Sequence, residues 1–240
     1  MTDLHSAKRG PMKNWFPFND YDFYAYITSG VILIATIDYA LGGSALVGRT
    51  EWSIVQGVFW TMISYVVGHV VAGLSSFVME QMLLKKVFTS PVQTILGLKQ
   101  SRWFELPFRY LFAREFSPFP QVTSDKIKSK LATTIGVDSP ALEDPETLFQ
   151  TAFSLARYAK DSEQRLSQFM NLYGLCRNVA FVGLIATVLL WFHACQTKSP
   201  TDAGMAWAAF ALALGMFGRF IKFYSAFTRE VLRAFERAAP

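Results

Sequence analysis

His69 lies inside an apolar stretch, "SYVVGHVVAGLSSF", and is the first candidate for a chemical role. An ionisable side chain at membrane depth is a functional-site candidate, because its burial has a cost that something must offset. Helical spacing puts His69 on one face with Ser76 and Glu80. Ser76 lies about 10 Å and Glu80 about 16 Å from His69 along the helix, which is beyond direct hydrogen bonding. An intramembrane enzyme or transporter using His69 therefore needs a partner from another helix. The alternative is packing, with a neutral imidazole bonded to a neighbouring serine or backbone carbonyl.

A second candidate pair combines Asp38 with His193. Asp38 lies three residues before the end of the first apolar segment, and His193 lies in "LLWFHACQ" near the end of the third. If these segments are neighbours, the two side chains form an ion pair or hydrogen bond; otherwise each reaches the lipid head groups. No nucleophile is tied to the pair. With only His5 as a further histidine, His69 also lacks partners for a metal site.

The region between Gln81 and Arg177 contains no histidine, and its only cysteine is Cys176. This disfavours a zinc site and any nucleophile paired with histidine. The chain also has no Walker-type phosphate loop and no dinucleotide fingerprint. We therefore expect a protein that is not an enzyme and holds no cofactor or metal.

A carboxylate-only active site remains formally open, with Asp138, Glu143, Asp144 and Glu146 as its members. These residues are better explained as a turn followed by a helix start. Asp144 then caps the helix, Pro145 takes its first position, and Glu146 lies in a first turn where the helix dipole favours negative charge.

The composition indicates a membrane protein. Of 240 residues, 52% are hydrophobic and only 17% are charged, against about 25% charged in soluble globular proteins. A transmembrane helix needs about 20 mainly apolar residues. The candidate segments are Phe23–Leu41, Trp52–Val78, Asn178–Gln196 and Ala203–Phe223. We therefore expect an all-α integral membrane protein with four transmembrane helices.

Basic residues predict the orientation, because lysine and arginine accumulate on the cytoplasmic side. Of 23 such residues, only Arg49 and Lys198 fall in the short connections 42–51 and 197–202. Both termini are therefore expected in the cytoplasm. The expected organisation is a cytoplasmic tail (1–22), a transmembrane hairpin (23–79), a cytoplasmic helical domain (80–177), a second hairpin (178–223) and a cytoplasmic C-terminal amphipathic helix (224–240).

The positive charge does not require a nucleic acid partner. A net charge of +5 follows equally from the positive-inside bias. The segment Ser101–Pro120 interleaves aromatic residues with arginines, which suits base stacking but more often marks a segment lying in a membrane interface. Membrane lipid is therefore the expected partner there.

After the fourth apolar segment, aromatic and aliphatic residues recur every four positions, as do Arg229, Arg233 and Arg237 on another face. This spacing is typical of an amphipathic helix continuing out of the bilayer. Its apolar face needs a partner, which is the 146–173 region of the same chain, another subunit or anionic lipid.

The second apolar segment also carries a stripe of small residues about 80° wide at helical spacing. Its members are Gly57, Thr61, Ser64, Gly68, Ala72 and Ser75. Small residues let helices approach closely, and such packing drives association in lipid. We interpret the stripe as a helix-packing face and as the seam of a homo-oligomer.

Four segments together resemble a group of small bacterial four-span membrane proteins, some of which are linked to antiviral defence. They are "YDFYAYITSG", "SYVVGHVVAGLSS", "FMNLYGLCRNVAF" and "FGRFIKFYSAFTREVLRAF". The resemblance implies an inner-membrane effector or sensor that works with a cytoplasmic protein partner. Together with the residues, it predicts an oligomer that alters membrane permeability. The alternatives are a membrane anchor or scaffold for a soluble partner, and the enzyme or transporter using His69.

Overall fold

The structure is a computed structural model, and it describes residues 22–41, 43–87, 91–98, 117–136, 144–157 and 163–238. In these ranges it comprises seven α-helices and two π-helical segments, without strands, so the all-α prediction is confirmed. In chain order the elements are η1 (Asp22–Ile27), α1 (Thr28–Leu41), α2 (Ile54–Ser75), η2 (Ser76–Val87), α3 (Pro91–Ile95), α5 (Gln121–Ile135), α6 (Pro145–Ala156), α7 (Glu163–Thr197) and α8 (Pro200–Arg237).

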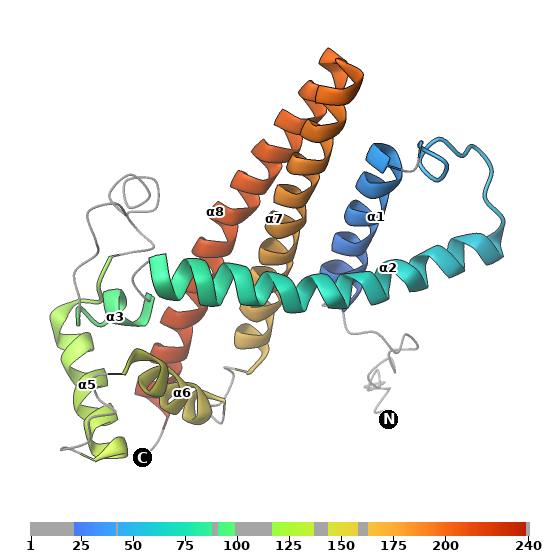
Figure 1. Cartoon of the computed structure of the whole chain (residues 1–240). Helices are drawn as coiled ribbons and strands as arrows, with labels where there is room; N and C mark the ends of the chain where they lie inside the picture. The colour runs from blue at the N-terminus through green and yellow to red at the C-terminus, as the bar shows by residue number, and fades with distance from the viewer. Residues whose placement is uncertain are drawn as a thin grey trace, which may run out of the picture.

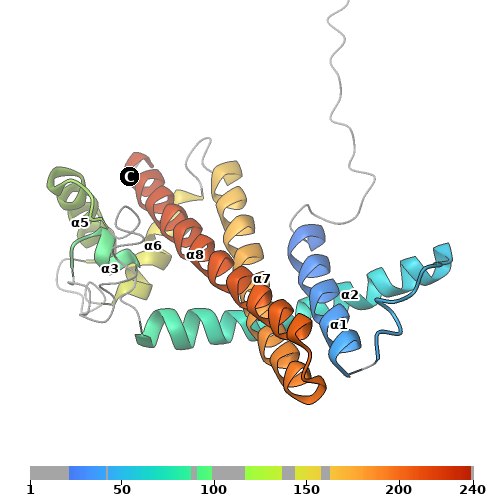
Figure 2. The same cartoon turned by 90° about the horizontal axis from the view of Figure 1, so that it is seen from above.

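Helices α7 and α8 form a long hairpin and lie side by side (Figures 1 and 2). The tight turn uses Lys198, whose φ is 54°, followed by Ser199, whose hydroxyl accepts a hydrogen bond from the amide of Asp202 at 3.3 Å. Along the hairpin the backbones approach closely, since a Cβ atom on Gly183 would lie 3.0 Å from the Cβ of Ala213. Small residues in both helices therefore permit this packing.

Three helices are long and apolar enough to cross a membrane: Ile54–Leu83, Gln164–Thr197 and Pro200–Arg237. A fourth apolar helix, Ala25–Leu41, has 17 residues, about 25 Å at 1.5 Å per residue. It is thus somewhat shorter than the bilayer core of about 30 Å.

The first expected hairpin does not form two parallel rods. Helix α1 lies beside α7, whereas α2 runs across α7 and α8 (Figures 1 and 2). The α2–η2 apolar helix of 30 residues measures about 45 Å, and an apolar helix longer than the bilayer is thick accommodates by tilting. It also continues without a break through the expected domain boundary at residue 79 and ends at Val87.

The short helices α3, α5 and α6 gather around the C-terminal end of α8 (Figure 1). Their shared core includes Ile95, Leu131, Ala152, Val231 and Phe235, each at most 1% exposed. Burying each large apolar side chain contributes about 1.5–3 kcal/mol, which holds these helices on α8. We call α3, α5, α6 and the 224–237 part of α8 the helical unit.

The start of α6 follows the predicted pattern. The Asp144 carboxylate accepts hydrogen bonds from the amides of Glu146 at 3.4 Å and Thr147 at 3.1 Å, and Pro145 takes the first helical position. The interpretation of Asp144 as a helix cap is therefore confirmed.

Some predictions concern residues outside the described ranges. They include the tail up to residue 21 with His5, the larger part of the aromatic segment (101–116), and the carboxylates Asp138 and Glu143.

Candidate functional site

A cluster of three buried polar side chains and the half-buried Glu80 joins α2 and η2 to α7; we call Ser75, Glu80, Arg177 and Asn178 the Arg177 cluster. The Glu80 carboxylate forms an ion pair with the Arg177 guanidinium. The Ser75 hydroxyl donates to Asn178 Oδ1 at 2.6 Å, and Arg177 Nη2 donates to the Ala72 carbonyl at 3.4 Å. These bonds tie the C-terminal end of α2 to α7 where its apolar part begins.

The Arg177 cluster fixes the helix register but has a free-energy cost, because it buries polar groups. Ser75 and Asn178 are fully buried and Arg177 is 8% exposed. Asn178 Oδ1 also accepts from Arg177, but Asn178 Nδ2 has no hydrogen-bond partner among the described residues. A buried donor without a partner costs about 1–3 kcal/mol, so the cluster fixes one helix register without being at an energetic optimum.

A second polar cluster lies at the opposite end of α7; we call Tyr39, His193, Thr197 and Asp202 the Asp202 cluster. The Tyr39 hydroxyl donates to Asp202 Oδ1 and the Thr197 hydroxyl to Oδ2, each at 2.8 Å. His193 Nε2 lies 3.7 Å from Oδ2. Asp202 is 5% exposed and stands in the first turn of α8, where the helix dipole favours its charge. The cluster fastens the last turn of α1 to the α7–α8 turn.

Asp38 and His193 have different partners, although α1 and α7 are neighbours. Asp38 Oδ2 accepts hydrogen bonds from the amides of Leu46 at 2.8 Å and Val47 at 2.9 Å, so it folds the 43–53 loop back onto α1. The neighbouring Tyr39 instead reaches Asp202, which His193 also faces. The Asp38–His193 pair does not form, because the loop amides bind the Asp38 carboxylate. The α1 residue that shares a partner with His193 is Tyr39, the next residue along the chain.

His69 is exposed rather than buried. Its ring stacks on Tyr26 of η1, with centroids 3.9 Å apart and planes at 25°, and meets the edge of Tyr65 at 4.6 Å. The predicted alignment with Glu80 does not bring those side chains together, because Glu80 turns to Arg177 and also accepts from the Ser76 hydroxyl at 3.3 Å. Aromatic stacking, rather than a serine or carbonyl bond, holds the imidazole.

The small-residue stripe of α2 meets α1 and η1 of the same chain at its centre. A Cβ atom on Gly68 would lie 1.9 Å from the carbonyl oxygen of Tyr26, and one on Gly30 would lie 1.8 Å from that of Ser64. Ser64, Gly68 and Ser75 are buried and Ala72 is half-buried. Gly57 and Thr61 lie beyond this crossing, Gly57 half-buried and Thr61 exposed. The centre of the stripe is thus occupied within the chain.

The three arginines expected on the C-terminal helix face have separate contacts. Arg229 and Arg233 both lie over the Phe119 ring, 5.5 and 5.6 Å from its centroid, and Arg229 also donates to Ser117. Arg237 pairs with Glu230 at 3.0 Å. Two of the three therefore clasp the 117–120 segment, while Phe227, Val231 and Phe235 face the core.

Sequence reasoning missed the residues that complete both clusters, namely Arg177, Asn178, Tyr39 and Asp202. A signal is present for Arg177 and Asp202, because charged residues that adjoin or enter apolar segments are generally paired. Their partners come from other helices, however, and only the packing of α1 and α2 against α7 identifies them.

No group of three or more His, Cys, Asp or Glu side chains suited to a metal ion occurs in the described part of the chain. No family model, curated protein or solved structure matches the chain. The contacts favour coupling between helices: one polar cluster joins α1 to the α7–α8 turn, the other joins α2 and η2 to α7, and the apolar core joins α8 to α3, α5 and α6.

Proposed function

We propose that this chain is a non-enzymatic four-span membrane protein whose cytoplasmic helical unit controls membrane permeability in response to a protein partner or signal. The observation that carries the proposal is the continuity of α8. It runs from Pro200 to Arg237 as one helix of 38 residues, about 57 Å, with Asp202 at the α7–α8 turn and Phe235 in the core of the helical unit. Because a helix is stiff, displacement at one end reaches the other.

The α1 contacts support a fourth span. Through Tyr39, the last turn of α1 lies level with the α7–α8 turn. Through Tyr26 of η1, the segment that leads into α1 meets the middle of α2 at Gly68. The apolar helix Ala25–Leu41, with 17 residues against 35 in α7, therefore runs along about half the length of α7. With four spans both termini lie on one side, as the basic residues favour.

Tryptophans support a membrane interface at the α7–α8 turn. Trp191 of α7 and Trp207 of α8 are exposed and meet edge to face at 5.7 Å. Trp52 and Trp60 lie in or just after the 43–53 loop. Exposed indoles gather at head-group level in membrane proteins, so this end of the bundle suits the interface opposite the helical unit.

A second apolar cluster supports transmission between the membrane helices and the helical unit. Met79, Cys176, Ala180, Phe220 and Ile221 pack where η2, α7 and α8 meet. Tyr173 contacts both this cluster and the core of the helical unit. Movement of the helical unit therefore acts directly on the layer that contains the Glu80–Arg177 ion pair.

Permeability requires more than one copy, because four helices of a single chain hardly enclose an aqueous path. Since α1 covers the middle of the small-residue stripe, we place the seam at the N-terminal end of α2. There Ile54 and Val58 are exposed, and a Cβ atom on Gly57 would meet nothing within 4 Å.

The test is the mass of the detergent-purified protein, corrected for bound detergent. The proposal expects a defined oligomer that Gly57→Leu shifts toward single chains. Gly204→Leu is the matched control, because Gly204 also has open space beyond its Cα, and it should leave the mass unchanged. A single-chain mass for the wild type would instead favour a membrane anchor for a soluble partner.

A further inference from the structure

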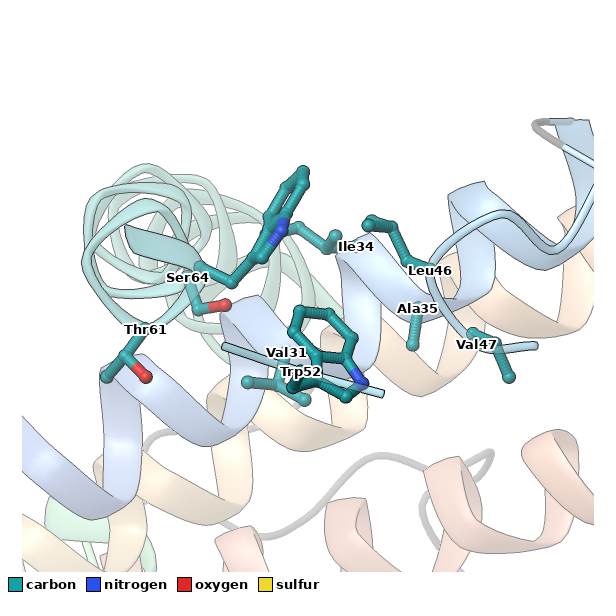
Figure 3. Close-up of a pocket in the computed structure, with 9 residues that line it drawn as sticks. Val31, Ile34, Ala35, Leu46, Val47, Trp52, Thr61 and Ser64 are labelled. Carbon is teal, nitrogen blue, oxygen red and sulfur yellow. The ribbon is translucent and has the colours of Figure 1, made fainter. Parts of the chain in front are cut away.

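A groove between α1, the 43–53 loop and α2 is built differently from the polar clusters. Its walls include Val31 and Ala35 of α1, Leu46 and Val47 of the loop, and Trp60 and Thr61 of α2, as Figure 3 shows for the labelled side chains among them. Its volume is about 230 Å³. Pockets for drug-sized ligands measure about 300–1,000 Å³, so the groove suits one narrow apolar chain.

Hydrogen bonds within the chain hold the groove in shape. In the loop wall, the backbone amides of Leu46 and Val47 both donate to the carboxylate of Asp38, which is 8% exposed. On the opposite wall, the Thr61 hydroxyl donates to the Gly57 carbonyl at 2.8 Å. The Asp38 carboxylate and the Thr61 hydroxyl are thus bonded within the chain, and apart from Thr61 and Ser64 the lining side chains are apolar or indole rings, so the groove favours an apolar occupant.

The mouth of the groove carries a positive charge. Trp52 lines the groove, and the exposed Arg49 guanidinium lies 5.8 Å from the centroid of its ring. An indole and an arginine next to an apolar groove match the interface between acyl chains and phosphates in a bilayer. A guanidinium also binds phosphate with two parallel hydrogen bonds.

We propose that this groove is a phospholipid site, in which one acyl chain lies between α1 and α2 and the phosphate lies at Arg49. The neighbouring side chains Met62 and Val66 of α2 are more than half exposed and face the same apolar surroundings. A lipid from the leaflet beside the 43–53 loop therefore reaches the groove without crossing water. Its binding fills the space that the tilted α2 leaves beside α1.

The experiment counts lipids retained on the purified, detergent-solubilised protein by native mass spectrometry. The probes are dioleoyl phosphatidylglycerol and dioleoylglycerol, which share their chains but differ in the phosphate. We expect one phosphatidylglycerol per chain. The affinity for diacylglycerol should be at least about tenfold weaker, since a hydrogen bond to a charged group is lost.

The variants separate the groove from its mouth. Ala35→Phe fills the groove and should abolish retention, whereas Ile37→Phe, on an exposed position of α1 outside the groove, should not. Arg49→Gln should bind phosphatidylglycerol no better than diacylglycerol. Glu51→Gln, on the same exposed loop, should behave like the wild type. Circular dichroism melts verify folding, and Val31→Trp replaces Ala35→Phe if that variant fails to fold.

Two results would overturn the proposal. One is unchanged phosphatidylglycerol retention in a folded Ala35→Phe or Val31→Trp protein, which would mean that the lipid lies elsewhere. The other is a groove-filling variant that keeps its lipid but loses oligomeric mass, which would identify a second copy of the chain as the occupant. Loss of assembly in Gly57→Leu alone would leave the lipid site intact, so the two proposals fail separately.

Discussion

Arg177 is a charged side chain, 8% exposed, at the point where α7 becomes apolar. Its partner Glu80 is more accessible, and the pair is joined by Asn178 and Ser75. Removing one member of a buried ion pair leaves the other uncompensated, and that cost exceeds the net contribution of the intact pair. The ion pair therefore holds η2 on α7 chiefly because Arg177, once buried, needs the Glu80 carboxylate to compensate its charge.

We expect Glu80→Gln to lower the free energy of unfolding by up to about 3 kcal/mol, since Arg177 then lacks its counter-ion. The double variant Glu80→Leu with Arg177→Met should recover most of this loss, because an apolar pair removes the unpaired charge. The control is Glu230→Gln, which breaks the more exposed Arg237 pair and should cost about 1 kcal/mol or less. Unfolding in detergent measures all three, and equal losses for Glu80→Gln and Glu230→Gln would contradict the assignment.

The candidate residues divide by whether local sequence determines their contacts. Asp144 caps a helix that begins one residue later, so spacing along the chain predicts its role. Asp38 and Glu80 were singled out for their chemistry, but their partners depend on a loop fold and a helix crossing. His69 was expected to be buried and hydrogen-bonded. It is instead exposed and stacks on Tyr26 of η1.

Among the elements, α2 determines how the apolar helices fit together. Hydrophobic length predicted it as a span, and the small stripe predicted a contact face. Neither indicates that α2 runs across α7 and α8 (Figure 1), because periodicity specifies a face and leaves the crossing angle open. The close approach of α2 to η1 and α1 depends on Gly68 and Gly30, where backbone meets backbone.

Gly68→Ala should destabilise the protein by about 1–3 kcal/mol, since its Cβ would lie 1.9 Å from the Tyr26 carbonyl oxygen and backbone cannot move aside as a flexible side chain does. Gly73→Ala in the same helix is the control. Its Cβ meets nothing within 4 Å, so it should be neutral or slightly stabilising. Thermal melts compare them, and a neutral Gly68→Ala would show that α1 and α2 do not cross as described.

For the whole molecule, the apolar helices and the helical unit share α8 and are not separate domains joined by a linker. The predicted boundary at residue 223 marks the end of the apolar segment, and α8 continues through it to Arg237, as the predicted amphipathic continuation of the helix required. Composition detects a change of environment, and the backbone need not break there. The same holds for η2, which passes the expected boundary at residue 79.

Introduced cysteines in a cysteine-free background test the four-span topology. A membrane-impermeant maleimide added to intact cells should label Ala45→Cys and Thr201→Cys, which stand in the two short connections. Ser6→Cys in the tail and Lys126→Cys in the helical unit should react only after lysis, because the basic regions stay in the cytoplasm. Labelling of Ser6→Cys in intact cells would mean that α1 does not span.

The central claim is that the helical unit restrains α8 and thereby controls permeability, and dye leakage from protein-containing vesicles tests it most directly. Val231→Ala loosens the core around α8, whereas Leu214→Ala trims an exposed apolar side chain of the same helix. Coupling of about 1–3 kcal/mol predicts leakage raised about 5- to 150-fold in Val231→Ala and unchanged in Leu214→Ala. Equal leakage from the wild type and both variants, with helical content retained, would contradict the account.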